Sequence, residues 1–289
     1  MMERNQLNLY QHLKSVAIML QPDEKGEDFL PGSQQLIDWL ARYDNWFKES
    51  VGINDGERPY TLYNREVSLF GVDLLSVPDK LKGLAAASIE KGYAISFTVD
   101  IVDLYRQFDV VQSLCGASLL SSLGIIIDNI DLLAEHTAVA DFMEKIVHLR
   151  LPVGLIGPVS LLRKHHILSL DAMNATDITI YPSMSATSPE TSSMPNHPVN
   201  KCANRIQLYI DNDGHMYPCL GMLGLKDYAM GHIDQEISET ALSGGHYKLN
   251  LPQLMNKGPD LTTATKPRQR MTTLPWICEQ HRAELLEHV

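Results

Sequence analysis

Short apolar runs alternate with helix-patterned segments along residues 1–181, and this alternation constrains the fold more than any other feature of the chain. Between the runs, apolar side chains recur at the spacing of one helical face, as in 34–51 and 136–149. Strands joined through helices are parallel, because a parallel pair needs a long crossover connection. The sequence therefore predicts an α/β fold. Its expected strands are 15–20, 66–75, 93–99, 123–131, 151–160 and 175–183.

The apolar pattern of the strands and the number of strand–helix units limit the possible architectures. A strand that starts as an uninterrupted apolar run, such as the one beginning at Leu123, is typical of a sheet covered on both faces. Pro78 is expected to open a helix that ends at Gly92. About five or six strand–helix units fit an open or closed (β/α) barrel, and an open doubly wound sheet is the alternative. The hydrophobic pattern alone does not separate the two.

A change of composition divides the chain after residue 181. Residues 182–200 are rich in Ser, Thr and Pro and have no apolar period, so we interpret them as a linker between units 1–181 and 201–289. The second unit opens differently, with alternating apolar residues from Ile206 to Ile210 followed by an Asp213-Gly214 turn. This pattern predicts a β-hairpin in a small α+β extension.

Charge and hydropathy exclude some classes of partner. Lys and Arg number 24 and Asp and Glu 35, for a formal net charge of −11, so we expect no nucleic-acid partner. No apolar run of about 18 residues occurs, and we expect no membrane span. The first residues lack the order of a signal peptide, so the expected location is cytoplasmic.

Three cysteines and a histidine in the second unit form the strongest candidate site. Cys202 and Cys219 flank the predicted hairpin, which would bring the two thiols together, and Cys278 and His281 are spaced to face one ion. Three thiolates and an imidazole suit zinc or an iron–sulfur cluster. The alternative is that these are ordinary buried cysteines and an exposed histidine. His215 or His232 could replace His281 as the fourth ligand.

The hairpin carries a resemblance to a known family. In the segment from Cys202 to Cys219, four residues separate Gly214 from Cys219. This spacing resembles the hairpin of the SPASM and twitch extensions of radical S-adenosylmethionine (SAM) enzymes. Gly231-His232-Ile233 is similar to the glycine-containing segment that follows it. The resemblance implies an auxiliary [4Fe–4S] cluster, or zinc at the same site. It also implies a peptide ligand or a partner enzyme.

The first unit resembles the partial (β/α) barrel of the same family. Gly71-Val72-Asp73-Leu74 is similar to its second-strand turn, Thr98-Val99-Asp100 to its third-strand segment, and Asp128-Asn129 to its fourth. The resemblance implies a radical-SAM-type partial barrel with a binding site at the carboxyl ends of the strands. Asp73, Asp100 and Asp128 would then bind a cofactor or the amine of a ligand. Their alternative role is to cap turns and helices.

The chain lacks the cysteine motif that binds the family's radical-generating cluster. The Cx3Cx2C motif that binds the radical-generating cluster should follow the first strand, yet residues 21–35 contain no cysteine, and the only cysteine before residue 200 is Cys115. Cleavage of SAM is therefore not expected. The resulting hypothesis is a degenerate radical-SAM-like protein that acts as a binding or partner subunit in peptide or natural-product modification. The alternative is a repurposed metalloenzyme that uses the C-terminal metal site or the barrel pocket.

Overall fold

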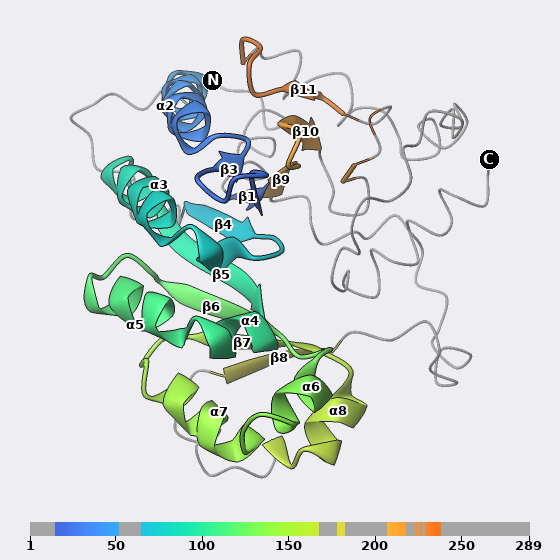
Figure 1. The fold of residues 1–289 in the computed structure, drawn as a ribbon. Helices are drawn as coiled ribbons and strands as arrows, with labels where there is room; N and C mark the ends of the chain where they lie inside the picture. The colour runs from blue at the N-terminus through green and yellow to red at the C-terminus, as the bar shows by residue number, and fades with distance from the viewer. Residues whose placement is uncertain are drawn as a thin grey trace.

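Nine strands of the protein form one mainly parallel sheet with helices packed on it (Figure 1). This computed structural model describes residues 15–51, 65–167, 178–182, 207–217, 223–224, 226 and 229–237. The predicted α/β class is confirmed. In chain order the strands of the sheet are β1 (Ser15–Met19), β4 (Glu66–Phe70), β5 (Ala94–Asp100), β6 (Ser122–Ile126), β7 (Val153–Gly157), β8 (Ile178–Pro182), β9 (Gln207–Ile210), β10 (His215–Tyr217) and β11 (Gly231–His232).

Helices connect most of the parallel strands. Pro78 begins α3, and Gly92 follows its end with φ +82°, as the sequence predicts. A 3-10 helix, η2 (Leu74–Ser76), lies between β4 and α3. The described α-helices are α2 (Ser33–Val51), α3 (Pro78–Glu90), α4 (Ile101–Arg106), α5 (Phe108–Gly116), α6 (Ile130–Ala134), α7 (Val139–Val147) and α8 (Val159–Lys164).

The strand order follows the chain from β1 to β8. The sheet runs β11-β10-β9-β1-β4-β5-β6-β7-β8, with parallel pairing from β9 through β8. A doubly wound sheet instead winds outward in two directions from a central strand. Here six strands advance in one direction along the chain, and among the described strands only β9, β10 and β11 lie beyond β1. Among the described strands β8 does not pair with β9, so this sheet is open.

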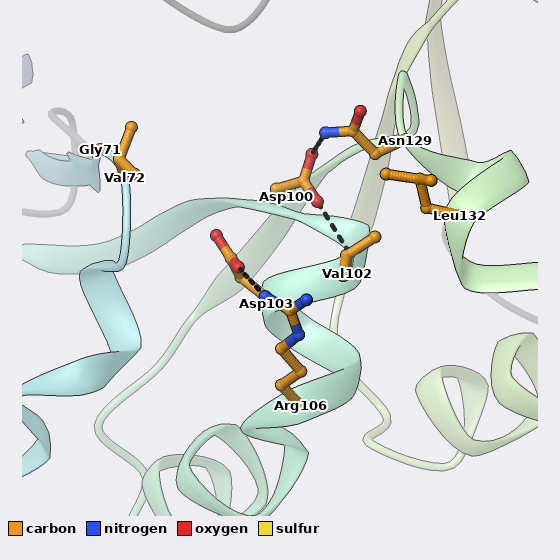
Figure 2. A pocket seen from close by; sticks show the side chains of 8 residues that line it. All are labelled: Gly71, Val72, Asp100, Val102, Asp103, Arg106, Asn129 and Leu132. Atoms are coloured by element: carbon orange, nitrogen blue, oxygen red, sulfur yellow. Dashed lines mark hydrogen bonds and ion pairs between the residues drawn. The ribbon is translucent and has the colours of Figure 1, made fainter. Parts of the chain in front are cut away.

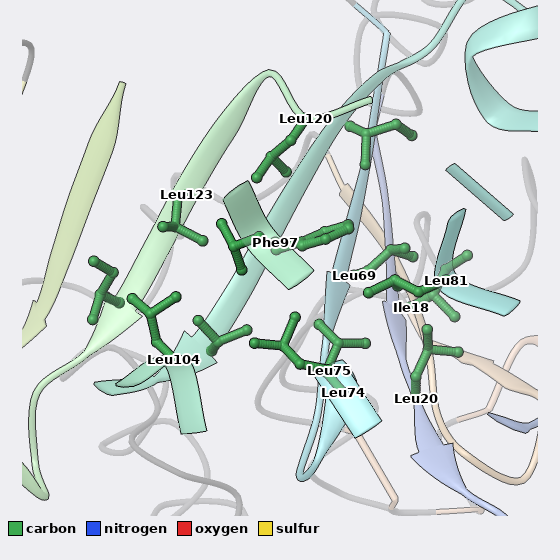
Figure 3. Close-up of a cluster of buried hydrophobic side chains, with 14 of the residues drawn as sticks. Ile18, Leu20, Leu69, Leu74, Leu75, Leu81, Phe97, Leu104, Leu120 and Leu123 are labelled. Atoms are coloured by element: carbon green, nitrogen blue, oxygen red, sulfur yellow. The ribbon is translucent and has the colours of Figure 1, made fainter. Parts of the chain in front are cut away.

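The hydrophobic core lies between one face of the sheet and the helices. Ile18, Leu69 and Phe97 of three neighbouring strands belong to the same buried cluster as Leu81 of α3 and Leu104 of α4, as Figure 3 shows. Every second residue of β4 and β7 is buried. This alternation differs from the expected sheet with two apolar faces, because the described helices lie on one face of these strands.

A row of serines crosses the opposite face of the sheet. Ser68, Ser96 and Ser122 occupy matching register positions on β4, β5 and β6, and the hydroxyl oxygens of Ser68 and Ser96 lie 2.6 Å apart. A Cβ at Gly124 would lie 2.8 Å from Thr98 Oγ1, so glycine leaves space there for the threonine. The hydroxyls of Ser68 and Ser96 therefore satisfy each other on this face.

The predicted hairpin is confirmed and joins the main sheet. β9 pairs in parallel with β1 and antiparallel with β10, and Gly214 closes the turn with φ +85°. Buried Asp211 organises this turn, since its Oδ1 accepts hydrogen bonds from the backbone N–H groups of Asp213 and His215. Its Oδ2 accepts a third bond from the Tyr217 hydroxyl at 2.9 Å. The hairpin is therefore continuous with the sheet of the first unit.

Candidate functional site

A cavity of about 230 Å³ opens at the carboxyl ends of β4, β5 and β6 (Figure 2). Loops at this end of a parallel sheet are where α/β proteins gather their binding groups. The walls combine two carboxylates, one guanidinium and one amide with apolar side chains. The lining residues are Gly71, Val72, Asp100, Val102, Asp103, Arg106, Asn129 and Leu132.

The β4 wall depends on an unusual backbone path. Gly71 has φ +149°, and a Cβ there would lie 1.8 Å from the carbonyl oxygen of Leu20. Only glycine therefore fits between the ends of β1 and β4. Asp73 then takes a left-handed conformation, with φ +55°, and leads into η2. The two turns place Val72 at the cavity and the Asp73 backbone beside α4.

Asp100 is the last residue of β5 and the N-cap of α4, and it also bonds to the segment that follows β6. One carboxylate oxygen, Oδ1, accepts a hydrogen bond from the Val102 backbone N–H at 2.8 Å, which is the geometry of a helix N-cap. The other, Oδ2, accepts from Asn129 Nδ2 at 2.7 Å, as the dashed lines of Figure 2 mark. The capping role that the sequence left as an alternative is thus confirmed for Asp100. The same residue also lines the cavity.

Asp103 is the second carboxylate of the cavity, one helical turn beyond Asp100. Burial raises the pKa of Asp103, and the nearby carboxylates of Asp100 and Asp73 raise it further. Arg106 opposes this shift from 3.9 Å, while a hydrogen bond from the Asp73 backbone also favours the charged form. The Arg106 side chain is 66% exposed, so water screens its charge. The cavity wall therefore favours a ligand that brings positive charge or hydrogen-bond donors.

The three aspartates predicted as cofactor-binding residues have different positions. Asp100 lines the cavity, and Asp73 lies close enough to influence Asp103. Asp128 is not among the lining residues, and its buried Oδ1 lies on the side of Gly157, where an added Cβ would be 3.3 Å away.

Sequence reasoning missed Asp103 and Arg106 as site residues and gave Asn129 no role. Asp103 and Arg106 follow Asp100 at helical spacing, which is a usable signal once α4 is recognised. Asn129 directly follows an apolar strand segment, as Asp128 does, but nothing local indicates that its amide reaches Asp100.

The two alternative histidine ligands lie beside each other on β10 and β11. Their rings make a T-shaped contact at 5.0 Å. His232 Nδ1 accepts a hydrogen bond from the Asp234 backbone N–H, so Nε2 carries the proton and donates to the Asp213 carbonyl oxygen at 2.7 Å. Both nitrogens of His232 are thus engaged within the protein. His215 Nδ1 is buried and lies 3.8 Å from Asp211 Oδ1.

The predicted metal ligands Cys202, Cys219, Cys278 and His281 lie outside the described residues. Among the residues that the structure describes, no group of three or more His, Cys, Asp or Glu side chains is arranged to hold a metal ion. The described cysteine, Cys115, is half-buried against the core, and burial raises its pKa. Zinc or a [4Fe–4S] cluster in the C-terminal unit therefore stays a prediction.

The segment after β1 forms a small hairpin of β2 (Gln21–Pro22) and β3 (Phe29–Leu30). Asp23 Oδ1 accepts a hydrogen bond from the Glu27 N–H, and Asp28 Oδ1 accepts from the N–H and hydroxyl of Ser33 at the start of α2. Phe29 is buried in the core. The atoms that this hairpin could offer to a metal are oxygens rather than thiolate sulfurs, so the hairpin does not fit a [4Fe–4S] cluster.

Comparison with known proteins adds no family assignment. No protein-family model matches the chain, and no curated protein matches it either. Within the described part of the chain, none of the helices combines the length and apolar character needed to cross a membrane.

Proposed function

We propose that this protein is a degenerate relative of the radical SAM enzymes, an opened (β/α) barrel that binds its ligand without radical chemistry. Its role is that of a binding or partner subunit in peptide or natural-product modification. The observation that carries the proposal is the cavity at the carboxyl ends of β4, β5 and β6, with Asp100 and Asp103 in its wall.

The strand order supports the barrel part of this proposal. From β1 to β8 the strands follow the chain, and β9, the next of the described strands, lies beside β1. Opening a closed (β/α) barrel between β8 and β9 would give the same strand order. The row of Ser68, Ser96 and Ser122 lies on the face away from the helices, which would be the inner face of such a barrel.

The hairpin after β1 supports a role without radical chemistry. A radical-generating cluster needs three thiolates at this position, whereas the loop here closes on its own carboxylates, Asp23 and Asp28. Asn212 of the β9–β10 turn donates a hydrogen bond to Gln21 at 2.9 Å, which ties the hairpin to the sheet. Protein groups therefore already hydrogen-bond the carboxylates of Asp23 and Asp28 in this loop.

The lining of the cavity indicates the chemistry of the ligand. Asp100 and Asp103 would receive an ammonium group, while Val72 and Leu132 offer an apolar surface beside it. A peptide with a free amino terminus and an apolar first residue has both features. The peptide class itself comes from the family resemblance.

Calorimetric titration with two matched probes tests this assignment. The probes are Leu-Ala-amide and its N-acetylated form, which differ only in the charged amino terminus. We expect the free amine to bind and the acetylated probe to bind at least about tenfold more weakly, since a charged hydrogen bond is lost. Asp103→Asn should lose the preference, whereas Asp109→Asn, on an exposed site outside the cavity, should keep it. Equal binding of the two probes would contradict the assignment.

A second experiment separates binding from catalysis. The protein is reconstituted with iron and sulfide without air, reduced with dithionite and incubated with SAM. We expect no 5′-deoxyadenosine above a control without protein. Its release at a catalytic rate would overturn the proposal of a degenerate member, whatever the probes show.

A further inference from the structure

We draw no further inference here: the strongest candidate, the carboxylate group of Asp73, Asp100 and Asp103 at the carboxyl ends of β4 and β5, belongs to the site already described, and its hydrogen bonds to Val102, Asn129 and the Asp73 backbone account for it without a second ligand.

Discussion

Gly71 lies against Leu20 so closely that any side chain on Gly71 would meet the Leu20 backbone, with 1.8 Å between the added Cβ and the carbonyl oxygen. A hydrogen bond joins the same two strands, since the Leu20 N–H donates to the Phe70 carbonyl oxygen at 2.7 Å. The carboxyl ends of β1 and β4 are therefore held together, and this contact shapes the β4 wall of the cavity.

Gly71→Ala should destabilise the protein by about 3 kcal/mol or more, because the backbone of β1 or β4 has to shift. Gly83→Ala provides a matched control in the exposed interior of α3, where an added Cβ meets nothing within 4 Å. That change should stabilise the protein by about 0.5–1 kcal/mol. Urea unfolding of both variants measures the contrast, and two effects of the same sign would contradict the described backbone path.

Arg65 and Asp44 form a buried ion pair that connects α2 to the start of β4, and Arg65 also bonds to Tyr93 beside β5. Asp44→Ala should cost about 3–5 kcal/mol, because a buried guanidinium would lose its counter-charge. The exposed pair of Lys164 and Asp131 is the comparison, and Lys164→Met should cost less than about 1 kcal/mol. Thermal and urea unfolding should rank the two variants in this order. Similar losses would mean that the Arg65 pair is not buried.

Asp103→Asn should remove a stability cost that is present at neutral pH and absent in acid. The raised pKa of Asp103 means that the folded state holds this proton more tightly than the unfolded state does. The carboxylate therefore costs stability at neutral pH, and the cost disappears as the pH falls through the folded pKa toward the ordinary value of about 3.9. We expect Asp103→Asn to exceed the wild-type protein in stability at pH 7 and to match it near pH 3.

Urea titrations at several pH values measure this difference. Asp109→Asn serves as the control, because Asp109 is exposed and lies outside the cavity lining. A difference between Asp103→Asn and the wild-type protein that grows toward acid pH would have the wrong sign for a raised pKa.

Asp211→Ala should cost about 3 kcal/mol, because it removes two hydrogen bonds of the β9–β10 turn and leaves the buried Tyr217 hydroxyl without its acceptor. In the same turn, Asp213→Ala removes only an exposed ion pair with Lys226 and should cost less than about 1 kcal/mol. Because β9 pairs with β1, the loss for Asp211→Ala should appear in global unfolding. A loss confined to hydrogen exchange within the hairpin would instead indicate that it unfolds independently.

Metal content tests the prediction for Cys202, Cys219, Cys278 and His281. Protein purified without air should contain about four irons with sulfide and absorb near 400 nm, or contain about one zinc and be colourless. Cys219→Ser should reduce that content, whereas Cys115→Ser should leave it unchanged, because Cys115 packs against the core. Metal-free wild-type protein, or equal loss in both variants, would remove the predicted site.

Local sequence signals predicted most of the described elements. The helix signals at Pro78 and Gly92 act within a few residues and were confirmed at both ends of α3. The expected strand 66–75 ends earlier, at Phe70, because Gly71 and Asp73 turn the chain with positive φ. A hydrophobic run does not reveal such a turn, because Leu74 and Leu75 in η2 are as buried as the strand residues.

Short helices were the main omission. α4 and α5 cover most of 101–116, where no element was predicted, and α8 begins within the expected strand 151–160. Helices of one or two turns show too little periodicity to be distinguished from an adjoining apolar strand. Because α4 was not predicted, Asp103 and Arg106 were not recognised as site residues, since their position at the cavity depends on that helix.

The sequence by itself determined most of the strands, the helices α2, α3 and α7, the Asp-Gly hairpin and the lack of thiolates after the first strand. These properties depend on side chains and backbone preferences within a few neighbouring residues. Only the tertiary structure decided that β9 joins β1, that Gly71 meets Leu20, and that Asn129 reaches Asp100 across 29 positions of the chain. Such contacts arise when helices and strands pack around a common core, and that arrangement depends on the whole set of elements rather than on any one segment.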